Sequence, residues 1–518
     1  MIGNVRRRHL SAVAASLLTL ASCAAAEPGV AVRRSDTAVA VSQDTTPPAE
    51  PPASTPASTP DAVPIPATDP QPDVTTPPPN SVELNPADAQ IDFGVNKTPR
   101  PYDDFLQASL ADIQEYWRET FPQIYGTAYT ELSGGIYAAY PERTEPIPGC
   151  GDTRTSSYEQ VAEGGAFYCE FGDFIAYDDA VLVPDFSERL GNSAVAIVLA
   201  HEFGHAIQQR SGVLAQSVDT VYLEQQADCF AGSWAAHVAR GESASLTFGD
   251  NEVRSGLIAM VEVKDPVEVG VTVFDASAHG SAFDRVGAFQ VGFVEGAPRC
   301  AQLIDNPLPL LNLQFSNNEE VANGGNLPYT DIGPAVEKDL NLFWVATFKN
   351  MGRTFSVPTV AAYRSGGPFP SCDSIAESEF PQHSLYCSNL NQVVFDDDFA
   401  RELYDRFGDF AYGYLVGNAW GDAAQTQLGS TLTGEARALA NDCLVGAWTK
   451  AALPENIPPN TAPDNDKLSV SPGDLDEAVS TALVTGDAAQ NDNIVGSSFE
   501  KIASFRAGVL NGISACGF

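Results

Sequence analysis

Residues 199–208 read LAHEFGHAIQ and contain the pattern His-Glu-x-x-His. On a helix, His201 and His205 project from one face at a spacing that suits a single metal ion. Glu202 lies beside them, where a carboxylate can accept a proton from metal-bound water. Because the chain has only 6 histidines, a chance occurrence of the pattern is rare. The pattern predicts a working zinc site, and the alternative is a helix whose two histidines are hydrogen-bonded in the core.

The residues around this pattern predict a helix that spans 192–212. Asn192 or Ser193 can cap its start, apolar side chains recur at helical spacing, and Gly212 can end it. A second helix is expected directly afterwards, at 220–241 (TVYLEQQADCFAGSWAAHVARG). A loop between the two lets the second helix return to the same cleft.

A catalytic zinc site needs a third protein ligand, with water in the fourth position. Glu224 lies near the start of the second helix, far enough beyond His205 for the chain to turn back towards it. Asp228 lies one turn further along the same face, where it can accept the outer N–H of a ligand histidine. His237 is a rival third ligand, but it lies about 20 Å beyond Glu224 along the helix axis. We therefore predict that Glu224 is the ligand and that Asp228 supports a histidine.

Five segments of the chain recur in the same order further on, with an offset that changes little from the first match to the last. Chance does not supply five such matches in order, so we predict two homologous domains, at 96–315 and 320–518. The three longest matches are FYCEFGDFIAYDD (167–179) with LYCSNLNQVVFDDD (385–398), ADCFAGSW (227–234) with NDCLVGAW (441–448), and GSAFDRVGAFQVGF (280–293) with GSSFEKIASFRAGV (496–509).

The second copy lacks all four residues of the predicted zinc chemistry. Structural positions persist, since Gly204 aligns with Gly421. A joint loss is expected if the four residues form one functional unit, so we predict one zinc ion per chain, in the first domain only. The four changes are His201 to Asn418, Glu202 to Ala419, His205 to Asp422 and Glu224 to Ala438.

His279 is also replaced in the second copy, where Val495 aligns with it, whereas the Gly-Ser that follows it is kept. We take His279 as a candidate for stabilising the oxyanion of a tetrahedral intermediate. The alternative is a loop histidine with no part in the reaction.

Eight of the 9 cysteines fall into two sets of four, one set per copy. Four cysteines allow three pairings in each domain. The first two of each set are close in sequence, and the last two are separated by nearly the same length of chain in both copies. The pairings we favour are Cys150–Cys169, Cys229–Cys300, Cys372–Cys387 and Cys443–Cys516.

Residues 1–22 have the form of an export signal, with three consecutive arginines before a short apolar run. The run ends in Leu-Ala-Ser-Cys, which resembles a lipobox and makes Cys23 the expected lipid-bearing residue of a bacterial lipoprotein held on the outer face of the cell membrane. The alternative is an ordinary secretory signal cut among the alanines at 24–26. Residues 23–95 are rich in Pro, Thr, Ser and Ala, which predicts a disordered tether.

The chain carries 28 basic and 67 acidic residues, a formal net charge of −39. Such a surface repels nucleic acid and anionic lipid headgroups. Nucleic acid is therefore excluded as a partner, and the expected contact with a membrane is made only by the N-terminal lipid.

The first copy resembles the bacterial neutral zinc metallopeptidases, which are members of the zincin group of HExxH proteases. The resemblance is close over roughly 150–300 and covers the second copy only in outline. It implies an α+β, mainly helical zincin-like domain in which His201, His205 and Glu224 bind zinc and Glu202 is the base. Asp284 departs from the pattern, because relatives often have an amide there. The motifs that carry the resemblance are Cys150-Gly151, Phe167-Tyr168-Cys169, Tyr177-Asp178, AHEFGHAIQ, EQQADCFAGSWA (224–235) and HGSAFDR (279–285).

These observations favour a membrane-tethered, extracytoplasmic zinc endopeptidase that acts on a protein or peptide substrate. The alternative is a non-catalytic cell-surface lipoprotein that binds proteins or envelope components. The presence of Glu202 favours the enzyme, since a structural zinc site has no need of a base beside the metal. A serine or cysteine protease is disfavoured, because no nucleophile-elbow pattern lies near the remaining histidines.

Overall fold

The computed structural model describes residues 89, 91–151, 154–263, 280–313, 315, 318–364, 367–370, 372, 383–457, 468–486 and 496–518, which fall in one compact unit. The predicted signal peptide, Cys23, nearly all of the predicted tether and His279 lie outside these residues. Within them, no helix combines the length and the apolar character needed to cross a membrane.

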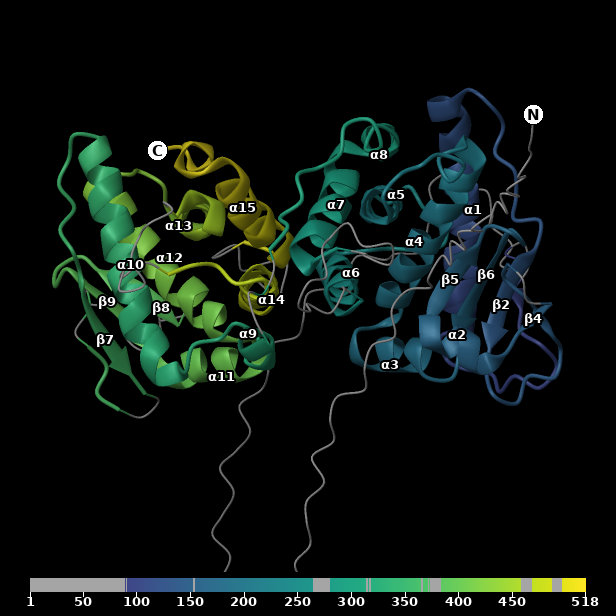
Figure 1. The fold of residues 1–518 in the computed structure, drawn as a ribbon, viewed down its shortest axis with the longest axis horizontal. Helices are drawn as coiled ribbons and strands as arrows, with labels where there is room; N and C mark the ends of the chain where they lie inside the picture. Colours follow the sequence, from purple (N-terminus) through teal and green to yellow (C-terminus); the bar gives the residue numbers. More distant parts are fainter. Residues whose placement is uncertain are drawn as a thin grey trace, which may run out of the picture. The chain divides into compact units, whose positions relative to one another are not determined.

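The first half of the described chain combines a mixed sheet with a group of long helices (Figure 1). Its elements are β1 (Ile91–Asp92), α1 (Asp103–Tyr125), β2 (Gly135–Ala139), β3 (Ile147–Pro148), β4 (Thr155–Ser156), α2 (Tyr158–Gly164), β5 (Ala166–Cys169), β6 (Phe174–Asp178), α3 (Leu182–Arg189), α4 (Asn192–Ser211), α5 (Thr220–Ala239), α6 (Asp250–Glu262), α7 (Ala282–Glu295) and α8 (Ala297–Ala301).

The main sheet of this half has the strand order β1-β2-β6-β5. The strands β1, β2 and β6 are parallel, whereas β5 runs antiparallel to β6 with Ala166 opposite Tyr177 and Cys169 opposite Phe174. All five residues of β6 are buried, as expected for a central strand covered on both faces. Strand β1 precedes residue 96, which the sequence analysis predicts as the start of the first domain. Strand β5 is at the edge of the sheet, next to helix α4.

Helix α4 is buried on nearly all sides, because its first half is an almost uninterrupted apolar run and α1, α3, α5 and α6 pack around it. It ends as predicted, with Gly212 in the left-handed conformation at φ 78°. The predicted cap was wrong. Gly191 precedes the helix without a side-chain cap, since Asn192 is already helical and its Oδ1 accepts a hydrogen bond from Ser187 Oγ at 2.5 Å.

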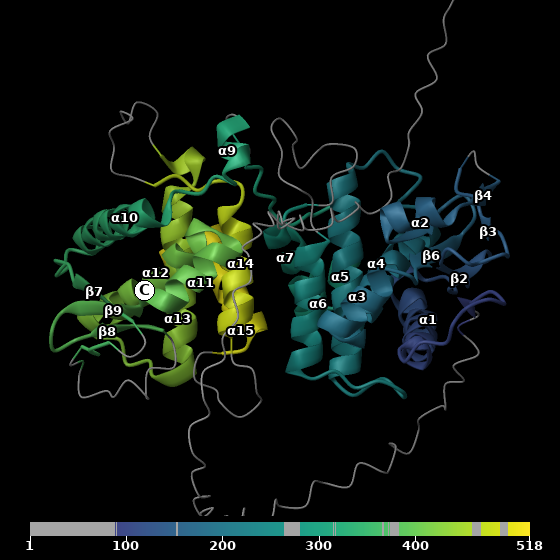
Figure 2. The same ribbon diagram turned by 90° about the horizontal axis from the view of Figure 1, so that it is seen from below.

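Helices α4 and α5 cross closely at Gly204, the glycine inside the His-Glu-x-x-His segment. A Cβ atom on Gly204 would lie 2.8 Å from the Cα of Ala227, which is too close for any other residue. The glycine therefore permits the approach that brings the polar side chains of the two helices together. Helix α7 packs against both α5 and α6 beyond this crossing, and Figure 2 shows α7 beside them.

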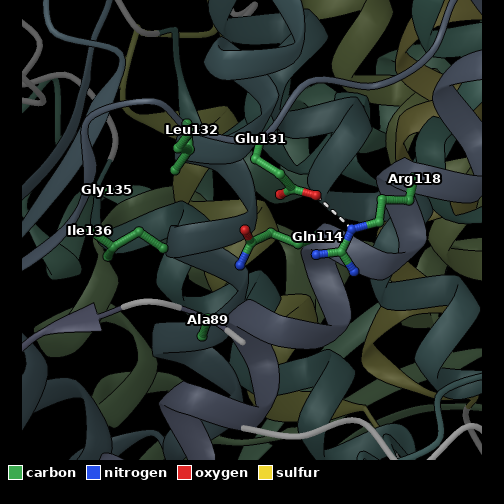
Figure 3. A pocket seen from close by; sticks show the side chains of 7 residues that line it. All are labelled: Ala89, Gln114, Arg118, Glu131, Leu132, Gly135 and Ile136. Atoms are coloured by element: carbon green, nitrogen blue, oxygen red, sulfur yellow. Dashed lines mark hydrogen bonds and ion pairs between the residues drawn. The ribbon is translucent and has the colours of Figure 1, made fainter. Parts of the chain in front are cut away.

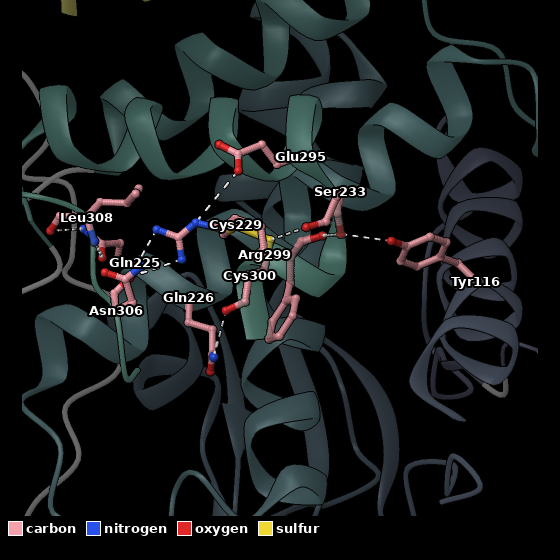
Figure 4. The surroundings of a disulfide bond; sticks show 12 residues. Tyr116, Gln225, Gln226, Cys229, Ser233, Glu295, Arg299, Cys300, Asn306 and Leu308 are labelled. Atoms are coloured by element: carbon pink, nitrogen blue, oxygen red, sulfur yellow. Dashed lines mark hydrogen bonds and ion pairs between the residues drawn. A yellow bond between two sulfur atoms is a disulfide. The ribbon is translucent and has the colours of Figure 1, made fainter. Parts of the chain in front are cut away.

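The structure contains all four predicted disulfides. The bond between Cys229 and Cys300 ties the middle of α5 to α8 across a separation of 71 residues (Figure 4). Gln226, one turn before Cys229, donates from Nε2 to the Cys300 carbonyl at 3.0 Å, so a hydrogen bond reinforces the covalent link. The predicted α+β, mainly helical and disulfide-stabilised class is thereby confirmed.

The second half has a three-stranded sheet of order β7-β9-β8, in which β7 and β9 are parallel and β8 is antiparallel, the same arrangement as β2-β6-β5. Its elements are α9 (Asn318–Ala322), α10 (Tyr329–Asn350), β7 (Thr359–Tyr363), β8 (Ser384–Cys387), β9 (Gln392–Asp396), α11 (Asp397–Phe407), α12 (Asp409–Leu428), α13 (Gly434–Ala452), α14 (Asp474–Thr485), α15 (Ser498–Asn511) and two short 3-10 helices, Pro454–Asn456 and Ile513–Cys516.

Individual bonds also recur in the two halves. Trp234 Nε1 donates to Asp112 Oδ1 at 2.8 Å in the first half, and Trp448 Nε1 donates to Asp339 Oδ2 at 2.7 Å in the second. In each case the bond fixes the helix that carries the tryptophan, α5 or α13, to the first long helix of its half, α1 or α10. The duplication stays a prediction, and these matched bonds agree with it.

Candidate metal centre

His201, His205 and Glu224 converge on one point between α4 and α5. The Nε2 atoms of His201 and His205 are 3.2 Å apart. Glu224 Oε2 lies 3.2 Å from His201 Nε2, and Glu224 Oε1 lies 3.4 Å from His205 Nε2. All three side chains are largely buried, and together they form a group that can hold a metal ion. The structure thus brings together the three ligands that the sequence predicted.

The spacing of these three side chains fits zinc. Ligand atoms about 2.0–2.1 Å from a tetrahedral zinc ion lie roughly 3.3 Å from one another. The two imidazole nitrogens are 3.2 Å apart, and the two oxygens of Glu224 lie 3.2 and 3.4 Å from one histidine each, so these separations are of similar size. Two imidazole nitrogens and one carboxylate are also the donors of many catalytic zinc sites, in which water takes the fourth position. The residues present therefore fit a zinc ion.

The outer nitrogen of each histidine has a partner of its own. His201 Nδ1 lies 2.7 Å from Asp228 Oδ1, as predicted, and His205 Nδ1 lies 2.9 Å from Gln208 Oε1. Both partners are acceptors, so each Nδ1 carries the proton and each Nε2 presents its lone pair to the common point. Gln208 is itself fixed, because its Nε2 donates to the Leu223 carbonyl at 2.6 Å. The sequence analysis did not predict this role of Gln208.

Asp228 is completely buried and needs a cationic partner there. Arg285 of α7 supplies it, with Nε 3.0 Å from Oδ2 and Nη2 2.8 Å from Oδ1. Burial alone would raise the pKa of Asp228, but Arg285 and His201 together hold the pKa of this carboxyl below its ordinary value. Arg285 was not predicted from the sequence, and its Nη1 is anchored on the Val263 carbonyl at 2.6 Å.

Burial also acts on His205, but its effect on the pKa is outweighed. Burial, the largest single cause, lowers the pKa of the imidazole, but Glu224 and Glu202 together raise it, and the net pKa lies above the ordinary value. The site thus has a surplus of negative potential that attracts a cation.

Glu202 is held next to the edge strand of the sheet. Its Oε2 accepts a hydrogen bond from the Tyr168 N–H at 2.8 Å, and only 1% of its surface is exposed. Tyr168 lies in β5, so the carboxylate is fixed between α4 and the strand. This placement suits the predicted role of a base, because the carboxylate is oriented by the backbone and is separate from the group of three ligands.

The structure separates His237 from this site. Its Nδ1 lies 3.2 Å from Glu242 Oε2, and its ring packs on Tyr116 with a centroid distance of 5.1 Å. His237 therefore does not lie with His201, His205 and Glu224, the group that could hold a metal ion. His279, the candidate for oxyanion stabilisation, lies outside the described residues.

The equivalent place in the second half has different chemistry. Asp422 stands where the first half has His205, and Arg437 Nε donates to its Oδ1 at 2.5 Å. Beneath it the buried ion pair is retained, because Lys501 Nζ lies 3.0 Å from both oxygens of Asp442. Asn418, aligned with His201, also hydrogen-bonds to Asp442. The second half therefore keeps the supporting ion pair without the ligands.

A separate group of buried acids lies at the starts of α12 and α14 and comprises Asp409, Asp474 and Glu477. Burial, followed by the charge of Asp409, raises the pKa of Asp474 to about 8. In the folded state Asp474 thus holds its proton to higher pH than in the unfolded chain, so its ionisation destabilises the fold as pH rises from about 4 to 8.

We expect Asp474→Asn, which cannot ionise, to be more stable than the wild type at pH 8 by more than about 1.4 kcal/mol, the equivalent of one pKa unit. The advantage should shrink towards pH 4. Urea unfolding midpoints at both pH values, without added divalent cations, measure it. Asp331→Asn, on an exposed position of α10, is the matched control and should show no such trend. An equal gain at both pH values would contradict the prediction.

A small pocket in the first half lies away from these residues (Figure 3). Its volume is about 50 Å³, which is room for one or two water molecules. Gln114 and Arg118 of α1 face it, and Arg118 Nε donates to Glu131 Oε1 at 2.5 Å. None of its lining residues is a predicted site residue, so the pocket plays no part in the candidate site.

Comparison with known proteins identifies relatives of the first half. An uncharacterized protein of Mycobacterium tuberculosis is 34% identical over 170 residues, which cover 29% of this chain and 58% of the relative. The uncharacterized protein YpfJ of Escherichia coli K12 is 28% identical over 214 residues, 38% of this chain and 68% of the relative. The chain thus spans less than two thirds of the mycobacterial relative's length. No solved structure matches significantly. Residues 73–303, which include the whole candidate metal centre, match the family described as "Putative neutral zinc metallopeptidase".

Proposed function

We propose that the chain is a zinc-dependent endopeptidase that binds one zinc ion through His201, His205 and Glu224. The observation that carries this proposal is the convergence of two imidazole nitrogens and the Glu224 carboxylate, with separations of 3.2 to 3.4 Å between the histidine nitrogens and from each of them to one carboxylate oxygen. Two imidazoles and one carboxylate are a common ligand set of catalytic zinc. The family match implies zinc and a peptide substrate at the level of the family.

A bound zinc ion supplies Lewis acidity, which polarises the scissile carbonyl and acidifies the attacking water. Glu202 accepts the proton of that water and returns it to the leaving amine. The Tyr168 N–H keeps the carboxylate in place during both transfers. Asp228, with Arg285, holds His201 in the tautomer that presents Nε2, and Gln208 does the same for His205.

The edge strand β5 suggests how a substrate is bound. Its position at the end of the strand order places it next to Glu202. An extended peptide can add to such an edge through its backbone, which brings a peptide bond beside the base without any demand on the side chains. This arrangement favours an endopeptidase over an enzyme that needs a chain terminus.

The remaining parts of the proposal rest on the sequence. The signal at 1–22, lipidation of Cys23 and the tether at 23–95 would hold the enzyme on the outer face of the cell membrane. Four disulfides agree with an oxidising compartment. We further propose that 320–518 is a metal-free duplicate of the enzyme domain, in line with the matched sheet order and the matched Trp–Asp bonds.

The first test is the metal content of the full-length chain beside that of His205→Ala. We expect one zinc ion per wild-type chain and essentially none in the variant after dialysis, since two ligands do not retain zinc against buffer. Asp422→Ala, at the aligned position of the second half, is the matched control and should keep its zinc. Elemental analysis together with circular dichroism makes the measurement.

Two results would count against the proposal. A folded wild-type chain that refuses added zinc leaves the non-catalytic surface lipoprotein as the better reading. Zinc that stays in His205→Ala but leaves with Asp422→Ala would place the metal in the wrong half.

A further inference from the structure

The start of helix α7 is capped less completely than its equivalent in the second half. Ser281 Oγ accepts from the Asp284 N–H at 3.2 Å and donates to Asp284 Oδ2 at 2.8 Å. In the second half, Ser497 and Glu500 form a full capping box, in which the glutamate also binds the N–H of the cap residue at 3.0 Å. The shorter Asp284 makes no such bond in α7. The first turn of α7 therefore depends more on acceptors from elsewhere.

The second half provides one such acceptor. Phe283, in the first turn of α7, donates its N–H to Asp476 Oδ1 at 3.1 Å. Asp476 lies at the start of α14 and is 2% exposed, so the bond is shielded from water. A carboxylate at this place also interacts favourably with the positive end of the α7 dipole.

Further contacts fix α7 against α15. Gln290 Nε2 donates to the Phe499 carbonyl at 2.8 Å, and Arg506 donates to the Phe283 carbonyl. These two bonds are equivalent, because Gln290 aligns with Arg506 and Phe283 aligns with Phe499. Each half therefore donates from the same position to the same carbonyl of the other half. This is the pattern of a two-fold interface, in which each partner offers the same position to the other. A Cβ on Gly287 would collide with the Arg506 side chain, so the glycine permits the close approach.

The first turn of α7 also carries the cation of the metal centre. Arg285 N–H donates to the Ser281 carbonyl at 3.0 Å, in the same turn that Asp476 caps. The Arg285 side chain binds Asp228, and Asp228 binds His201 Nδ1. A short path of bonds thus leads from the second half to a zinc ligand.

We propose that Asp476 is a positioning residue for the metal centre, which acts by holding the start of α7 so that Arg285 stays on Asp228. The second half then contributes to the site of the first, although its residues aligned with the three ligands are Asn418, Asp422 and Ala438. This inference rests on the proposed zinc site, and it assigns a task to 320–518.

The test uses Asp476→Ala and Asp476→Asn in the full-length chain. Zinc affinity is measured by competition with a chromophoric chelator, and ligand geometry by the visible spectrum of the Co²⁺-substituted protein. Hydrogen exchange of the peptide that spans 282–285 reports the cap. We expect faster exchange, a zinc Kd raised about 2- to 30-fold, the range that corresponds to loss of a cap, and an altered Co²⁺ spectrum in Asp476→Ala. Asp476→Asn keeps an acceptor oxygen, so its exchange rate, zinc Kd and Co²⁺ spectrum should be close to those of the wild type.

Asp396→Ala is the matched control. Asp396 caps α11 of the second half through the N–H groups of Asp398 and Phe399, and this helix has no part in the path to Arg285. The control should leave zinc affinity and the Co²⁺ spectrum unchanged. If Asp476→Ala does not fold, Gln290→Ala, which removes the bond to Phe499, is expected to raise the zinc Kd in the same direction.

Two outcomes would overturn the inference. One is faster exchange in α7 with an unchanged zinc Kd and Co²⁺ spectrum, and the other is an equal loss of zinc affinity in Asp396→Ala. Failure of the proposed function looks different, because then the wild-type chain itself binds no zinc while hydrogen exchange still shows whether Asp476 caps α7.

Discussion

Glu202→Gln is expected to keep its zinc and its fold but to lose peptide hydrolysis by about 10²- to 10⁴-fold in kcat, the usual contribution of a general base. The amide has nearly the same shape as the carboxylate and can still accept the hydrogen bond from the Tyr168 N–H. It cannot take a proton from water. Zinc is retained because the three converging donors do not include Glu202.

Cleavage of a peptide library, read by mass spectrometry, measures this effect without knowledge of the preferred sequence. Glu188→Gln, on an exposed position of α3, makes the same chemical change away from the site and should cleave like the wild type. Equal cleavage by Glu202→Gln and the wild type would rule out Glu202 as the base. A zinc-bound wild type that cleaves no member of the library would favour the non-catalytic lipoprotein.

Arg285→Met is expected to destabilise the first half by about 3–5 kcal/mol, because it leaves the buried Asp228 carboxylate without its cation. It should also weaken zinc binding by up to about 10- to 100-fold, the typical effect of disturbing the outer partner of a metal-bound histidine, because Arg285 holds Asp228, the partner of His201. Urea unfolding and chelator competition measure the two effects.

Lys501→Met is the matched variant of the second half, where Lys501 pairs with the buried Asp442. It should be destabilised by a similar amount, about 3–5 kcal/mol, while its zinc affinity changes far less than that of Arg285→Met. Arg285→Lys introduces the residue type found at the aligned position of the second half. It should recover part of the stability and part of the zinc affinity that Arg285→Met loses. A normal zinc affinity in folded Arg285→Met would show that the ion pair serves the fold alone.

The sequence predicted those parts of the site that depend on local periodicity. His201 and His205 are joined by helical spacing, and Glu224 with Asp228 by the same spacing on the next helix, so one-dimensional information was enough. Pairing the cysteines succeeded for a related reason, since two copies with matching separations left little choice among the alternatives.

Other parts depend on contacts between distant segments and could not be read in this way. Arg285 reaches Asp228 across 57 residues, and the Tyr168 N–H that holds Glu202 is a backbone group without any sequence signal. Gln208 did leave a signal, because it persists as Gln425, which donates to the Arg437 carbonyl at 2.9 Å as Gln208 does to Leu223. The predicted cap of α4 failed because the side chain of Asn192 is used by Ser187, a neighbour in space.

The ion pair beneath His201 has a consequence for how such a site can be lost during evolution. Asp228 is neutralised by Arg285 and not by the metal alone, so loss of a histidine leaves no uncompensated charge in the interior. A duplicate gene can therefore shed its ligands one substitution at a time through products that still fold. If 320–518 is the metal-free duplicate that we propose, Asp442 with Lys501 is the expected end of such a path, in which the neutral interior outlasts the ligands.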